Sequence, residues 1–234
     1  MPPPPAFHPY GASHQVVLVA TVFMFACLVL VSRTRLAGAA EKMLGTVLLL
    51  IFPLSLIGNS HHGTLDAQKM LPLQYCDIAC IAGGIALWTR HQFCCEVLYF
   101  FGLAGTLQGL ITPALMYDYP DTRFFMFFLL HSSVPVAAIY AVTAMGHRPR
   151  PGSVLRMMLF SVSWYGVTAL VNWALGTNYA FQCQKPPQAS LFDHLGAWPW
   201  YNFSAIGLGV VFYSVLYLPF AFRRAVPASH APRE

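Results

Sequence analysis

Long apolar stretches separated by short polar segments make up most of the chain from residue 16 to residue 222. Seven runs of about 16 to 22 residues can be distinguished: 16–31, 43–58, 73–89, 93–112, 124–145, 154–175 and 203–222. A helix rising 1.5 Å per residue needs about 17 to 25 residues to cross a bilayer core. The pattern predicts an all-α, polytopic membrane bundle of about seven transmembrane helices. Six is the alternative, because the second run is short and contains Pro53.

The composition supports a membrane protein with a single domain. Hydrophobic residues make up 57% of the 234-residue chain and charged residues only 9%, whereas soluble domains carry about 25% charged residues. We expect one transmembrane domain over residues 15–222, with a disordered Pro-rich tail at 1–14 and a second disordered tail at 223–234. The first 14 residues lack the basic segment of a signal peptide, so we expect the first helix to remain in the mature protein.

The distribution of Lys and Arg predicts the orientation in the membrane. With the N-terminus outside, ten basic residues fall on the inner side and three on the outer side, which is the asymmetry expected for an integral membrane protein. The net charge of +5 is therefore a signal of topology and of contact with anionic lipid, and gives no reason to expect a nucleic-acid partner. We predict N-terminus out and C-terminus in.

With this orientation, polar residues of several helices gather in the outer leaflet. His131 lies about seven residues into the fifth run, or ~10 Å deep at the helical rise. Polar side chains at membrane depth usually face the bundle interior and often mark function, although they can also serve only to bind helices together. The outer-leaflet set that we regard as candidate cavity or oxyanion-binding residues comprises Gln74, Asp77, Gln108, Asn172 and Asn178.

Cys76 is the cysteine with the most distinctive surroundings. It lies in "LPLQYCD", in the first turn of the third helix, where unpaired N–H groups and the positive end of the helix dipole favour a thiolate. A neighbouring imidazole such as His131 could accept its proton, as in Cys/His nucleophiles. The alternatives are a structural thiol or a disulfide with Cys183. A zinc site using Cys76, Asp77 and the histidines is less favoured, because no ligand pair has the usual helical spacing, and we expect neither metal nor cofactor.

Several segments resemble a known family over about residues 40–222, in the same order. They are "LPLQYCDIA", "YFFGLAGTLQGLITP", "RFFMFFLLHS", "RPRPGSVLR", "VNWALGTNY" and "FDHLGAWPWY". The chain is similar to the YwaF-type integral membrane proteins, whose eukaryotic relatives are cysteine-dependent transmembrane acyltransferases that act on phospholipids. The architecture also resembles the androgen-induced-type transmembrane lipid hydrolases.

The resemblance implies a catalytic pair, with Cys76 as nucleophile and His131 as general base and acid. The expected reaction moves an acyl group from a phospholipid to a lysophospholipid through a thioester, and hydrolysis of the same intermediate is the alternative. Arg123 is the candidate for binding a lipid phosphate. The resemblance to the bacterial-like branch favours a bacterial-type inner membrane, with the active site toward the outer leaflet.

A receptor or transporter of seven helices is the rival class, in which the same polar cavity binds a solute. Transporters usually show internal repeats and broken helices. No repeat is visible in this chain, although Pro53, Pro113 and Pro135 permit kinks. Reactivity of a cavity cysteine toward acyl-type electrophiles would discriminate the two classes.

Overall fold

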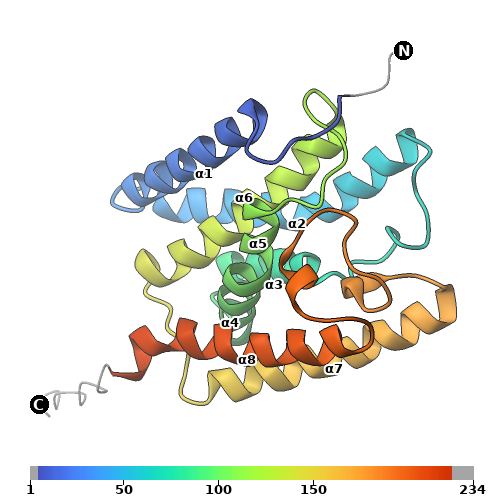
Figure 1. Cartoon of the computed structure of the whole chain (residues 1–234). Helices are drawn as coiled ribbons and strands as arrows, with labels where there is room; N and C mark the ends of the chain where they lie inside the picture. The colour runs from blue at the N-terminus through green and yellow to red at the C-terminus, as the bar shows by residue number, and fades with distance from the viewer. Residues whose placement is uncertain (1–4, 223–234) are drawn as a thin grey trace, which may run out of the picture.

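A computed structural model describes residues 5–222, which form a bundle of α-helices with short connections (Figure 1). The elements are α1 (Ala12–Val31), α2 (Ala37–His61), α3 (Tyr75–Thr89), α4 (Gln92–Phe101), the π-helical turn η1 (Gly102–Thr106), α5 (Leu107–Ile111), α6 (Thr122–Thr143), α7 (Ser153–Leu175), the 3₁₀ turns η2 (Tyr179–Phe181) and η3 (Leu191–His194), and α8 (Trp200–Ala221). The fold class predicted from the sequence is confirmed.

Six of these helices are long and apolar enough to cross a membrane, with α4, η1 and α5 counted as one continuous helix. The seventh apolar helix, α3, has only 15 residues. The sequence pattern had indicated the second run as the short one. That prediction was wrong: α2 continues for 25 residues through Pro53, and the short helix is the third.

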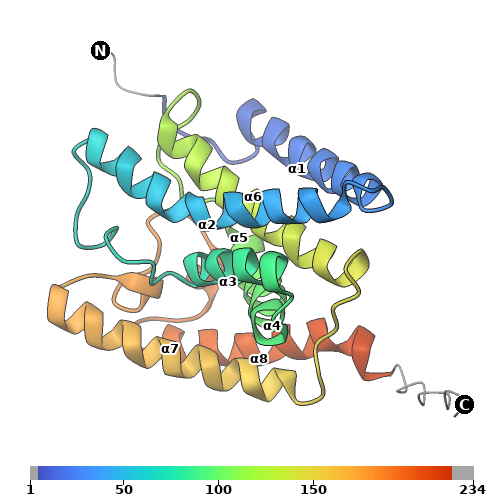
Figure 2. The same cartoon turned by 180° about the vertical axis from the view of Figure 1, so that it is seen from behind.

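The helices are arranged in two groups around a central pair (Figures 1 and 2). α1, α2 and α6 lie on one side, α7 and α8 pack against each other on the opposite side, and α3 and α4 lie between the groups. The most extensive packing joins α3 to both α2 and α4. The buried core is therefore centred on α3, the helix whose second residue is Cys76.

Glycines let α2 and α3 approach closely. A Cβ added at Gly84 would lie 2.9 Å from the carbonyl oxygen of Gly45, and one added at Gly45 would lie 3.2 Å from the carbonyl oxygen of Gly84. Small residues of this kind let helix backbones pack in a membrane, where the hydrophobic effect gives little force between helices. This crossing holds α3 in its central position.

The start of α3 lies inside the bundle, and not at its outer surface. The Trp164 indole N–H donates to the Leu73 carbonyl oxygen (3.1 Å), and the Tyr75 hydroxyl donates to the Ser161 carbonyl oxygen (3.0 Å). Trp164 and Ser161 precede the C-terminal end of α7 by 11 and 14 residues, or ~16 and ~21 Å along the axis. The segment before α3 therefore descends into the bundle, which explains why α3 is short.

Residues 5–14 are ordered, in contrast to the predicted disordered tail. The Phe7 N–H donates to the Met116 carbonyl oxygen (3.1 Å), and the Phe7 side chain is buried. His14 is fully buried, with Nε2–H donating to the Leu110 carbonyl oxygen (2.8 Å) and Nδ1 accepting from the Tyr10 N–H (3.0 Å). The tail prediction for residues 1–4 and 223–234 lies outside the described residues.

Ion pairs join helices and connecting segments at the end of the bundle that the charge pattern places inside. The buried Glu96 carboxylate accepts from Arg150 and Arg156 at 3.0–3.1 Å. A second pair joins Glu41 and Arg90 at 2.8 Å. A lone buried carboxylate would be costly in a membrane, and these arginines compensate both acids.

We expect Cys183, which is exposed in the loop between α7 and α8, to react with a membrane-impermeant maleimide in intact cells. In a Cys183→Ser background, Arg148→Cys should react only after the cells are opened, because ten of thirteen basic residues favour an inner position for that end. Gln92 donates only to the backbone carbonyl of Arg148, so replacing the Arg148 side chain leaves this hydrogen bond intact. The opposite labelling pattern would refute the predicted orientation.

Candidate functional site

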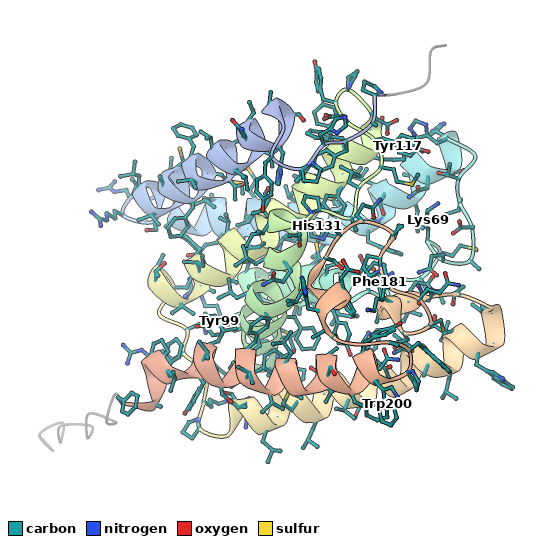
Figure 3. All side chains as sticks on the ribbon, in the orientation of Figure 1. Lys69, Tyr99, Tyr117, His131, Phe181 and Trp200 are labelled. Atoms are coloured by element: carbon teal, nitrogen blue, oxygen red, sulfur yellow. The ribbon has the colours of Figure 1, made fainter. Side chains whose placement is uncertain are left out.

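A cavity of about 660 Å³ opens between the two groups of helices, a size typical of small-molecule sites. Its walls come from α2, the start of α3, η1 and α5, α6, α7, α8 and the loop that joins α7 to α8. Cys76 and His131 both line this cavity, and His131 is labelled near the centre of the molecule in Figure 3. The structure therefore brings the predicted nucleophile and base to one chamber.

The His131 imidazole is held in a defined orientation by its own helix. Its Nδ1 lies 2.8 Å from the Phe127 carbonyl oxygen, which can only accept a hydrogen bond, so Nδ1 carries the proton. The ring also stacks on Phe127, with centroids 4.0 Å apart. Within residues 5–222, Nε2 has no hydrogen-bond partner, which leaves its lone pair available to take a proton from a group in the cavity.

Gly109 of α5 provides the space that His131 occupies. A Cβ added at this position would overlap His131 Cδ2 and lie 2.5 Å from Nε2. The imidazole cannot turn aside without losing its bond to Phe127 and its stacking. Gly105, four residues earlier on the same cavity wall, has no atom within 4 Å of an added Cβ. Only one of these two glycines is therefore required by the histidine.

Cys76 is the second residue of α3, where the helix leaves backbone N–H groups without helical partners. The N–H groups of Asp77 and Ile78 both donate to the Gln74 carbonyl oxygen, at 3.0 and 3.2 Å. In the described part of the chain, the N–H groups of Tyr75 and Cys76 have no acceptor. Two N–H donors at and next to Cys76 are therefore unpaired, and unpaired backbone N–H groups are the type of donor that stabilises an oxyanion.

Gln74 and Asp77 order the beginning of α3. The Gln74 N–H donates to Asp77 Oδ2 (3.2 Å), so the carboxylate caps the helix that carries Cys76. Gln74 Oε1 accepts from the Ala180 N–H (2.9 Å) and so ties α3 to the loop between α7 and α8. Both side chains line the cavity, and both position the backbone around Cys76.

The chain was also compared with known protein families, curated proteins and solved structures. The sequence profile of the TMEM164 family matches residues 9–217. The chain belongs to the TMEM164 family. No curated protein and no solved structure matches it.

In this TMEM164-family protein, Asn172 and Asn178 lie outside the cavity, contrary to the role considered from the sequence. The buried Asn172 amide donates to the Tyr179 carbonyl and to Gln182 Oε1 (both 3.0 Å), and it accepts from Thr177 and the Tyr179 N–H. Asn178 bonds the backbone of Cys183 and Gln184. Their polar groups are used to fold the loop between α7 and α8, and neither residue lines the cavity.

Gln108 is the remaining polar candidate on the cavity wall. It lies on α5, beside Gly109, and its side-chain amide makes no hydrogen bond with residues 5–222. The π-helical turn at Gly102–Thr106 immediately precedes it, and such turns often occur at functional sites. Gln108 can therefore donate to or accept from a molecule in the cavity.

Three basic side chains line the rim of the cavity. His62, Lys69 and Arg123 come from three different segments, and Lys69 Nζ lies 3.4 Å from Asp66 Oδ2. Arg123 donates to both Asp121 oxygens, at 2.8 and 2.7 Å, and its guanidinium lies 3.5 Å from the centroid of the Tyr117 ring. This pairing lowers the pKa of the Asp121 carboxyl to about 2. Arg123 is thus firmly positioned, with its charge partly offset.

The cysteines of the chain are all free thiols in the structure. Cys183 is exposed in the loop between α7 and α8, while Cys76 faces the cavity, so the structure does not contain the disulfide that was the alternative for Cys76. Within residues 5–222 no three His, Cys, Asp or Glu side chains come close enough together to hold a metal ion.

Proposed function

We propose that this TMEM164-family protein is an intramembrane acyltransferase that moves a fatty acyl group between phospholipid and lysophospholipid. The observation that carries the proposal is that Cys76 and His131 line one cavity, with His131 Nε2 free and Nδ1 bonded to Phe127. The resemblance to YwaF-type proteins and their cysteine-dependent acyltransferase relatives supports the same reaction.

The first half-reaction transfers the acyl group to the enzyme. Cys76 Sγ attacks the carbonyl carbon of the phospholipid ester as its proton passes to His131 Nε2. The free N–H groups of Tyr75 and Cys76, assisted by Gln108, stabilise the oxyanion. When the intermediate collapses, the carbon–oxygen ester bond breaks and His131 returns the proton to the leaving lysophospholipid oxygen. The product is a Cys76 thioester.

The second half-reaction releases the acyl group. A hydroxyl of another lysophospholipid attacks the thioester carbonyl, His131 takes the hydroxyl proton, and the Cys76 sulfur leaves and recovers that proton. If water attacks instead, the same site acts as a lipid hydrolase. The apolar character of most of the cavity wall favours a lipid acceptor over water.

The basic rim suits the phosphate of the lipid. Arg123, with His62 and Lys69 beside it, would hold the head group at the outer end of the cavity. With the orientation predicted from the basic residues, the lipid comes from the outer leaflet, in a bacterial-type inner membrane.

The test is transfer in a defined bilayer. Purified protein in nanodiscs receives phosphatidylcholine with an isotope-labelled acyl chain and an unlabelled lysophospholipid. We expect labelled product phospholipid to appear, with its formation dependent on the lysophospholipid. Release of labelled fatty acid alone would identify a hydrolase. No turnover with either acceptor across lipid head groups would contradict both enzyme readings and favour a receptor or transporter.

A further inference from the structure

One face of α8 forms an uninterrupted apolar wall of the cavity. Ala205, Ile206, Gly209 and Phe212 recur at helical spacing and all line the cavity. Polar groups bound this wall at each end. Asn202 stands at the outer end, and at the inner end the Tyr213 hydroxyl lies 3.0 Å from Ser161 Oγ. From residue 202 to residue 213 the wall extends ~16 Å along the helix.

The cavity combines this wall with the basic rim and with the Cys76 and His131 site. A basic rim above an apolar chamber is complementary to an amphipathic molecule with an anionic head group and a long hydrocarbon chain.

Gly209 is the smallest residue on this wall, and it faces Met158 of α7. An added Cβ would meet only Met158, with Sδ at 3.8 Å and Cε at 4.0 Å, so a larger side chain would project into the cavity between α7 and α8. Gly207, two residues earlier, is exposed on the outside of α8, does not line the cavity and has no atom within 4 Å of an added Cβ. The two glycines thus form a matched pair on opposite faces of one helix.

We propose that the α8 face formed by Ala205, Ile206, Gly209 and Phe212 is the acyl-chain subsite, and that Gly209, opposite Met158, determines which chain lengths are accepted. The proposal rests on the proposed function, because the chain it binds is the one presented to Cys76. Gly209 determines specificity because its lack of a side chain leaves room beside Met158 for the far end of a long acyl chain.

The binding test does not depend on catalysis. Phosphatidylcholines with ether-linked hexadecyl or octyl chains cannot transfer them, and their binding is measured as protection of Cys76 from N-ethylmaleimide in the full-length protein. In wild type the hexadecyl lipid should protect more strongly. Gly209→Leu should weaken hexadecyl protection by about tenfold or more, because displacing even two methylenes from apolar surface changes binding by that factor. Octyl protection should change little.

Gly207→Leu is the control and should behave as wild type with both lipids. Gly209→Ala should give a smaller shift in the same direction, which keeps the test informative if Gly209→Leu does not fold. Equal hexadecyl protection in wild type, Gly209→Ala and Gly209→Leu would overturn the subsite. If the subsite behaves as expected while no acyl transfer occurs, the proposed function fails and the subsite stands.

Discussion

Replacing Cys76 by alanine is expected to reduce acyl transfer by about a thousandfold or more, the scale seen when one member of a nucleophile–base pair is removed. His131→Ala should give a loss of the same order, and the double variant should be no worse than either, because the two residues act as one unit. Transfer of labelled acyl chains in nanodiscs measures all three. Cys76→Ser should retain only trace turnover, since a hydroxyl depends far more on the base than a thiol does.

The matched control for this prediction is Cys80, one turn further along α3. Its thiol donates to the Leu48 carbonyl oxygen (3.1 Å), it is buried, and it does not line the cavity. Cys80→Ala should lower thermal stability and preserve turnover, whereas Cys76→Ala should abolish turnover with only a small loss of thermal stability. The stability cost of Cys76→Ala should stay below the 2–5 kcal/mol typical of a core Leu→Ala, because the substitution removes only one sulfur atom from a cavity wall. Full turnover in Cys76→Ala would contradict the nucleophile assignment.

Gly109→Ala is expected to reduce transfer by about a hundredfold, the cost of displacing a catalytic group by ~1 Å. The added methyl would overlap His131 Cδ2 and lie 2.5 Å from Nε2, so we expect the imidazole to move and to lose its bond to Phe127. Gly105→Ala is the control, because its methyl would enter open space on the same wall. Transfer rates and thermal unfolding of both variants provide the measurement.

A general packing defect at Gly109 can be distinguished from a displaced base. If His131 is the proton acceptor, Gly109→Ala should add no further loss to His131→Ala, in which the ring is absent and the methyl has room. Additive losses in the double variant, or wild-type turnover in Gly109→Ala, would show that Gly109 does not act through His131.

The elements that could be predicted from the sequence are those that depend on local pattern. Apolar runs of membrane-spanning length determined the helices, and all seven expected runs correspond to helical segments. Cys76 and His131 could be placed on one side because helix direction and charge asymmetry set the depth of each residue. That they line a common cavity is a property of the packed bundle, and here the prediction and the structure agree.

Other features depend on contacts between distant segments, which no local pattern contains. Asn172 has the chemistry expected of a cavity residue, but its amide donates to Tyr179 and Gln182 in the loop between α7 and α8. Likewise, α3 starts deep in the bundle because two hydrogen bonds join its beginning to α7. Trp164 of α7 donates to the Leu73 carbonyl, and Tyr75 of α3 donates to the Ser161 carbonyl. The role of Gly109 follows from where His131 packs, so a glycine in "TLQGL" gives no signal by itself.

The most direct test of the account is to trap the acyl-enzyme. Wild-type protein is mixed with phosphatidylcholine in the absence of lysophospholipid, quenched in acid, and analysed by intact mass and peptide mapping. We predict one added acyl group on Cys76, removable by neutral hydroxylamine as a thioester is, present in Cys80→Ala and absent in Cys76→Ala. Turnover without any adduct on Cys76, or an adduct located on another residue, would contradict the central claim.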